Sequence, residues 1–459
     1  IMANFTTDGK ICIEREIEVT NGHLLPDDLV SRFDIIPTCK WIEDNKFERV
    51  CLQFPDELLG ASVRVYEEIK NRVDVDLYIL GDTSYASCCV DTVAAMHVKG
   101  EAVIHYGHSC FSTWSIPVFT VLPKRDLNVD DIVKMIREKS NFDDEKLCLF
   151  YDAEFEHCKV NLTKAWFTLY PQSYTAEVSI EEQERRFLGR IVKDSEGRVH
   201  TADDLKDCVC IYMGSKGQTL FNYTISVAAK EWYLLDPGIS TLERMDETTW
   251  FKRRRFLIEK CKDAAAVGIL VCQLAGALTK DIISRLKQLC RVNGKKSYIV
   301  SVGKPNVAKL ANFPEIDIYV MVACPENDLY SNRDFYKPIV YPFELEVALN
   351  SNREPYYTNH VTEYGDLLPG RKYYCDIHHV KELTDVSLIT GKIRETKVNS
   401  TDGGSLELEA KQNWALENIG KNLQDRSWQG LEQKLGETEV KLAEEGRKGI
   451  PLQYSNEPE

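Results

Sequence analysis

The sequence predicts an α/β protein of three related domains, each with a small parallel sheet flanked by helices. Three observations support this fold class. Short apolar segments alternate with helical segments, which is the pattern of βαβ units and therefore of parallel sheets. The apolar segments are nearly continuous, as expected for strands that helices cover on both faces. The alternation also recurs along a chain of 459 residues, which is too long for a single core.

The first unit starts with an apolar segment that ends at Phe54 and is followed by Pro55-Asp56-Glu57, which caps a helix. A second apolar segment ends at Gly81-Asp82, and a loop with two adjacent cysteines follows it. The expected elements are strand 50–54, a helix from 55 to about 71, strand 76–80, helix 90–98, and strands 102–106 and 118–122.

The third unit repeats this order. Thr279-Lys280-Asp281 supplies a helix start, and Asn293-Gly294 supplies the stop. In this register Cys110 and Cys324 occupy equivalent positions, because each follows the third strand of its unit. The expected elements are strand 268–272, a helix from 279 to about 291, strand 297–302, a short helix near 307–311, strand 316–323 and strand 338–341.

The middle unit follows the pattern more loosely. Its strand at 208–213 ends in Gly214-Ser-Lys-Gly217, at the position where the outer units carry a cysteine after their third strand. The expected elements are strand 147–151, a charged helix at 179–186, strand 208–213 and strand 232–235.

These units give a division of the whole chain. The tail is acidic and polar, so we expect it to be extended, partly mobile or wrapped on a partner. The predicted parts are an N-terminal extension at 1–29, α/β domains at 30–143, 144–262 and 263–370, and a C-terminal extension at 371–459.

Composition excludes several functional classes. A formal net charge of −15 argues against nucleic-acid binding, which needs a basic surface. No run of 18 apolar residues is present, so we expect no membrane span, and the N-terminus lacks the pattern of a signal peptide. Fifteen cysteines, an odd and unevenly spaced set, argue against a disulfide framework and for a reducing, cytoplasmic location.

Four cysteines lie in loops that follow predicted strands: Cys88, Cys89, Cys110 and Cys324. Loops after parallel strands open at one edge of a sheet, which is where ligands bind, so we expect these thiols to meet. Such a group indicates a soft-metal site, with iron–sulfur as the preferred interpretation. No zinc-finger spacing is present. The choice between the adjacent Cys88 and Cys89 stays open, and the other cysteines are expected to be core thiols.

Several segments together resemble the diphthamide synthesis family, most closely its second eukaryotic subunit. The resemblance covers roughly residues 25 to 455. The segments that carry it are Leu52–Leu59, Gly81–Asp91, His105–Cys110, Gly303–Asp317, Val322–Asn327, Ser427–Leu431 and Arg447–Ile450.

The resemblance implies three α/β domains around one [4Fe-4S] cluster, with a cysteine from each domain on three irons and S-adenosylmethionine on the fourth. This family releases a 3-amino-3-carboxypropyl radical, which adds to a histidine of elongation factor 2 in the first step of diphthamide biosynthesis. In eukaryotes the second subunit forms a heterodimer with a similar, catalytic first subunit. A small iron-binding protein is expected to donate electrons to the complex.

The sequence departs from the catalytic pattern in the middle domain. Arg190 stands where the family's catalytic subunit carries a cysteine ligand, and no cysteine lies between Cys158 and Cys208. The resemblance therefore implies a supporting role, in which a cluster on this chain helps to reduce the catalytic subunit's cluster and the partner binds S-adenosylmethionine. The alternative is a cluster-free scaffold that stabilises the partner and docks elongation factor 2.

Overall fold

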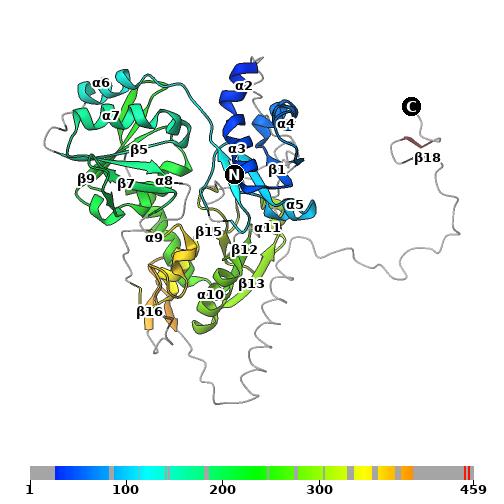
Figure 1. Ribbon diagram of the computed structural model, residues 1–459. Coiled ribbons are helices and arrows are strands. Elements are labelled where there is room, and N and C mark those ends of the chain that lie inside the picture. Colours follow the sequence, from blue (N-terminus) through cyan, green and yellow to red (C-terminus); the bar gives the residue numbers. More distant parts are fainter. Residues whose placement is uncertain are drawn as a thin grey trace. The chain divides into compact units, whose positions relative to one another are not determined.

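The structure is a computed structural model that describes most of the chain between residues 26 and 395 (Figure 1). The expected helix at 179–186 lies almost entirely outside the described residues, as do residues 1–25 and most of the expected tail. The described residues are 26–81, 87–112, 114–139, 142, 145–179, 186–245, 248–272, 278–302, 305–327, 335–353, 360–377, 384–395, 449–450 and 453–454.

The chain divides into two compact units, Ile1–Ser400 and Thr401–Glu459. The first contains three larger sheets and a small antiparallel pair, β16 (Thr384–Val386) and β17 (Ile393–Glu395). The second contains an antiparallel pair, β18 (Gly449–Ile450) and β19 (Gln453–Tyr454). Within the described part of the chain, no helix has the length and apolar character needed to cross a membrane.

The first sheet is parallel, with the strand order β2-β1-β3-β4. Apolar clusters cover both of its faces. Its strands are β1 (Arg49–Gln53), β2 (Asp76–Leu80), β3 (Ala102–Tyr106) and β4 (Val118–Val121). Its helices are α2 (Pro26–Arg32), α3 (Ile35–Asn45), the 3-10 helix η1 (Asp56–Ala61), α4 (Ser62–Lys70) and α5 (Thr92–His97). The helix expected from 55 to 71 is thus a 3-10 turn followed by an α-helix.

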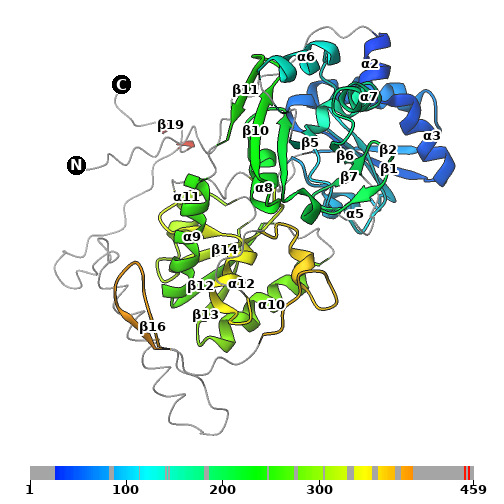
Figure 2. The same ribbon diagram turned by 90° about the vertical axis from the view of Figure 1, so that its left-hand side faces the viewer.

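The third sheet repeats this topology, with the parallel order β13-β12-β14-β15. Helices α9, α10 and α12 pack against it (Figure 2). Its strands are β12 (Ala266–Val271), β13 (Lys296–Ser301), β14 (Ile318–Val322) and β15 (Ile339–Val340). The helices are α9 (Thr248–Asp263), α10 (Thr279–Val292), α11 (Val307–Ala311), α12 (Pro342–Leu349) and the 3-10 helix η5 (Tyr364–Leu367).

The middle sheet has seven strands in the order β11-β10-β9-β5-β6-β7-β8. Its central four strands are parallel and repeat the topology of the other two sheets, while β7, β8 and β11 add antiparallel edges. The strands are β5 (Lys146–Tyr151), β6 (Tyr174–Val178), β7 (Arg190–Asp194), β8 (Val199–His200), β9 (Cys208–Met213), β10 (Glu231–Asp236) and β11 (Thr241–Arg244). The helices are α6 (Val129–Lys139), η2 (Ala153–Cys158), α7 (Lys159–Leu169), η3 (Ala202–Leu205) and α8 (Gln218–Ser226).

The predicted fold class is therefore confirmed, with a middle sheet that is larger than expected. Residues of α6 pack into the core of the middle sheet, and residues of α9 pack into the core of the third. These contacts favour one domain boundary just before α6 and another just before α9. The limits 30–143, 144–262 and 263–370 stay predictions.

Candidate metal centre

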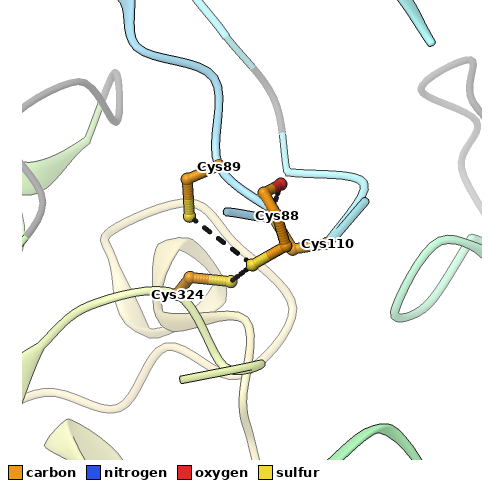
Figure 3. A group of neighbouring side chains, drawn as sticks. All are labelled: Cys88, Cys89, Cys110 and Cys324. Carbon is orange, nitrogen blue, oxygen red and sulfur yellow. Dashed lines mark hydrogen bonds between the residues drawn. The ribbon is translucent and has the colours of Figure 1, made fainter. Parts of the chain in front are cut away.

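The four cysteines expected to meet do lie together (Figure 3). Cys88, Cys89, Cys110 and Cys324, here called the thiol tetrad, have sulfur atoms that all lie within 4.8 Å of one another. Cys88 Sγ is 3.9 Å from Cys89 Sγ and 3.6 Å from Cys324 Sγ. Cys110 follows β3 and Cys324 follows β14, so the equivalence of these two positions is also confirmed.

The loop that carries Cys88 and Cys89 is held between β1 and α5. Gln53, the buried last residue of β1, donates from Nε2 to the carbonyl oxygen of Cys89 at 2.7 Å, and its Oε1 accepts from the backbone N–H of Asp91 at 2.9 Å. Asp91 in turn caps α5 by accepting from the N–H of Ala94 at 2.8 Å. The two cysteines are thereby fixed by a strand end and by a helix start.

Cys110 is joined to this loop through the backbone. Its N–H and its Sγ both contact the carbonyl oxygen of Cys88 at 3.3 Å. His105 of β3 contacts the carbonyl oxygen of Ser87 through Nε2 at 3.0 Å, and burial lowers the pKa of this imidazole. His105 therefore joins β3 to the loop that carries Cys88 and Cys89.

Glu326 links the tetrad to all three sheets. Its backbone N–H donates to Cys324 Sγ at 3.4 Å. Its carboxylate accepts from Thr219 Oγ1 at 2.7 Å and from Asn222 Nδ2 at 3.2 Å, both on α8. It also lies 3.7 Å from Nε2 of His108. Burial disfavours protonation of His108, yet the hydrogen bond to Glu326 raises its pKa above the usual value.

The thiols of the tetrad strongly affect one another. Hydrogen bonds from Cys324, Cys88 and Cys89 hold the pKa of Cys110 well below its usual range. The contact with Cys110 raises the pKa of Cys88 and of Cys89, and burial raises the pKa of Cys324. Because metals bind thiolates, ligation by all four sulfurs would release protons.

A cavity of about 20 Å³ adjoins the tetrad, which is room for roughly one water molecule. Arg190 lines it from β7, almost fully buried, with Nε donating to Tyr223 Oη at 2.9 Å and the guanidinium 5.3 Å from the ring of Tyr151. The middle unit thus contributes a cation to the lining. Residues from all three units line the cavity, among them His108, Cys110, Arg190, Thr219, Tyr223 and Glu326.

Gly189 lets the middle unit approach the loop of Cys110. It adopts φ +71°, and a Cβ there would lie 2.5 to 2.7 Å from the side chain of Phe111. The residue after Cys110 is therefore in contact with the turn before β7. Gly197, in the turn between β7 and β8, has a similar φ of +78° but has nothing within 4 Å of its Cβ position.

Replacing Gly189 with alanine should lower the free energy of unfolding by about 2–4 kcal/mol, because left-handed strain adds to overpacking against Phe111. Gly197→Ala, the matched control, should cost only about 1–2 kcal/mol, since it carries the left-handed strain alone. Urea unfolding of the two variants measures the difference. Equal losses would show that the contact with Phe111 adds nothing.

Most of the other described cysteines are buried, as expected for core thiols. Cys208 and Cys210 both lie on β9 and belong to the same apolar cluster, as expected for core thiols. Cys158 and Cys375 are only half-buried, and Cys12 lies outside the described residues.

Sequence analysis missed Gln53 and Glu326. Gln53 could have been found, because it is a polar residue at the end of an otherwise apolar strand. Glu326 could not, because its partners are remote in the sequence.

Comparisons with known proteins agree with the geometry. Residues 54–358 match the family model described as "Putative diphthamide synthesis protein". The chain is 35% identical to "2-(3-amino-3-carboxypropyl)histidine synthase subunit 2" of Danio rerio, over 99% of this chain and 97% of that protein. It is 32% identical to the protein of the same name from Homo sapiens, over 99% of both chains.

A solved structure has the same fold at lower identity. It is described as "Crystal structure of Dph2 from Pyrococcus horikoshii with 4Fe-4S cluster" and aligns with a TM-score of 0.57 at 20% identity. The alignment covers 72% of this chain and 94% of the other. The three-sheet architecture described above is therefore shared with that protein.

Proposed function

Because the chain belongs to the diphthamide synthesis protein family, we propose that it is the iron–sulfur subunit of a heterodimeric 2-(3-amino-3-carboxypropyl)histidine synthase. The complex would modify a histidine of elongation factor 2 in the first step of diphthamide biosynthesis. In this role the chain pairs with a similar catalytic subunit and supports the reduction of that subunit's [4Fe-4S] cluster. The full-length similarity to proteins named as subunit 2 supports the assignment.

The single observation that carries the iron–sulfur role is the thiol tetrad. Its donor chemistry fits a cluster, because thiolates are the ligands of iron–sulfur centres. Cys88, Cys89 and Cys324 are buried, and the N–H of Glu326 points at Cys324 Sγ. We assign Cys89, Cys110, Cys324 and Cys88 as the residues that hold the cluster. When bound, a [4Fe-4S] cluster supplies one-electron transfer at a potential set by such hydrogen bonds and by burial.

The partner is the better site for S-adenosylmethionine. The cavity beside the tetrad has room for about one water molecule, and Arg190 is one of the middle-unit residues that line it. In the proposed role, the chain binds the partner subunit and passes electrons to it. A small iron-binding protein is the expected electron donor. The described cysteines form no disulfide, which suits the reducing cytoplasm.

The test is iron and acid-labile sulfide analysis of the anaerobic heterodimer, with the partner's own cluster cysteines replaced. We expect about four irons and four sulfides per heterodimer, as for one [4Fe-4S] centre, and a cubane-type EPR signal after dithionite reduction. Absence of iron under these conditions would overturn the iron–sulfur role and leave the scaffold that docks elongation factor 2.

A further inference from the structure

The sulfur atoms of the thiol tetrad have the spacing of a site for one metal ion. Two of the contacts are 3.6 and 3.9 Å, and every pair lies within 4.8 Å. A tetrahedral ion with zinc–sulfur bonds of about 2.3 Å separates its ligands by about 3.8 Å. A cubane places two irons and bridging sulfides between any two thiolates, so their sulfur atoms stand farther apart. The observed separations, which are also those of hydrogen-bonded thiols, are closer to the smaller centre than to a cubane.

We propose that the chain without a cluster binds one thiophilic divalent cation, such as Zn²⁺ or Fe²⁺, through all four sulfurs of the thiol tetrad. Four thiolates around one ion form a closed, structural type of site, because no position is left for water or substrate. Soft thiolate ligands select zinc or iron over magnesium and calcium.

The surroundings leave the four sulfurs as the only ligands among the described residues. Nε2 of His105 contacts the carbonyl oxygen of Ser87, and Nε2 of His108 is directed to Glu326. Nδ1 of His105 has no hydrogen-bond partner, but His105 does not belong to the group that surrounds the four sulfurs. The carboxylate of Glu326 already accepts hydrogen bonds from the side chains of Thr219 and Asn222 on α8. No carboxylate or imidazole belongs to the group of potential ligands that the structure brings together.

The site would join two sheets. Cys88, Cys89 and Cys110 come from loops of the first sheet, and Cys324 comes from the third. A single ion would fix the sulfurs at the short separations seen here, whereas a cluster requires them to spread. The two metal forms are therefore mutually exclusive, and an ion bound first would block assembly of the cluster.

Cobalt titration of the full-length, metal-free chain under anaerobic conditions tests this proposal. Tetrahedral Co²⁺ with four thiolates gives intense visible bands and a sulfur-to-cobalt charge-transfer band that grows with the number of thiolates. We expect one Co²⁺ per chain with this spectrum, and stoichiometric displacement by Zn²⁺. A weak, octahedral-type spectrum would overturn the proposal.

Cys324→Ser and Cys88→Ser each remove one ligand, and each should lower the affinity for Co²⁺ at least tenfold and weaken the charge-transfer band. Cys272→Ser is the matched control, since Cys272 is buried at the end of β12 but lies outside the tetrad, and it should leave the titration unchanged. Circular dichroism confirms that each variant is folded. Binding that survives in a folded Cys324→Ser or Cys88→Ser variant would contradict four-sulfur ligation.

The cobalt experiment tests the ion site and the iron experiment tests the proposed function, so either result can be negative while the other is positive. Tetrahedral cobalt binding without iron and sulfide in the heterodimer would uphold the ion site and overturn the proposed iron–sulfur role. Iron and sulfide without tetrahedral cobalt binding would do the reverse. Zinc added before reconstitution with iron and sulfide should also prevent cluster formation, and unchanged iron uptake in its presence would contradict mutual exclusion.

Discussion

Replacement of Glu346 with alanine is expected to lower the free energy of unfolding by about 3–5 kcal/mol, because it leaves two buried cations without their counter-charge. Glu346 lies on α12 and is fully buried. It accepts from Nε of Arg285 and, at 2.6 Å, from Nε of Arg353. These arginines also donate to the carbonyl oxygens of Cys375 and Tyr373, each at 2.6 Å. The carboxylate therefore ties α10 and the segment after η5 to one helix.

Urea unfolding followed by circular dichroism measures this loss. Glu346→Gln should lose less, because its amide oxygen still accepts one hydrogen bond while the charge is removed. Asp203→Ala is the surface control: its ion pair with Lys206 is more than half exposed, so the change should stay within about 0.5 kcal/mol. A loss for Glu346→Ala as small as that of the control would contradict the proposed importance of the buried charges.

Replacement of Cys324 with serine is expected to remove the metal from the chain while the fold is kept. The third sheet contributes only this residue to the thiol tetrad, so serine leaves three sulfurs on the first sheet and no soft ligand opposite them. Iron retained by the anaerobic heterodimer whose partner cannot bind a cluster should fall from about four atoms to fewer than one. The far-ultraviolet circular dichroism spectrum should be unchanged, since the apolar cores lie elsewhere.

Cys272→Ser separates loss of a ligand from loss of a buried thiol. Burial raises the pKa of Cys272 to about 12, so this side chain is a neutral core thiol. Both substitutions bury a hydroxyl in place of a thiol and should cost similar stability, about 1–3 kcal/mol. Only Cys324→Ser should lose iron. Equal iron loss in both variants would assign the effect to the fold and not to ligation.

The sequence was most informative where a strand is parallel and buried on both faces. The expected limits of β2, β3 and β9 match the structure, because a near-continuous apolar run bounded by turn residues has few other interpretations. Strands β6, β7, β8 and β11 were missed. They are short, three of them pair antiparallel at the edges of the middle sheet, and their mixed polarity resembles that of a loop.

The meeting of Cys88, Cys89 and Cys110 was also predictable, because loops that follow parallel strands of one sheet open at a common edge. Cys324 belongs to a different sheet and reaches them only through the packing of the two sheets. The burial of the charged residues of α12 was not predictable from the sequence. Glu344 and Glu346 occur in a short helix, where a carboxylate normally marks the exposed face, and only the approach of Arg254, Arg285 and Arg353 explains their burial. The distances between the sulfurs depend on how the first and third sheets pack, and no sequence pattern encodes that packing.

Because the four cysteines of the thiol tetrad are far apart in the sequence, metal insertion has to wait until late in the synthesis of the chain. Cys88 and Cys324 are 236 positions apart in the sequence. At a translation rate of about 5–20 residues per second, the nascent chain carries Cys88, Cys89 and Cys110 for roughly 10 to 50 seconds before the fourth cysteine is made. The complete ligand set therefore exists only after Cys324 has left the ribosome, so all four thiols can bind a metal only late in the synthesis of the chain.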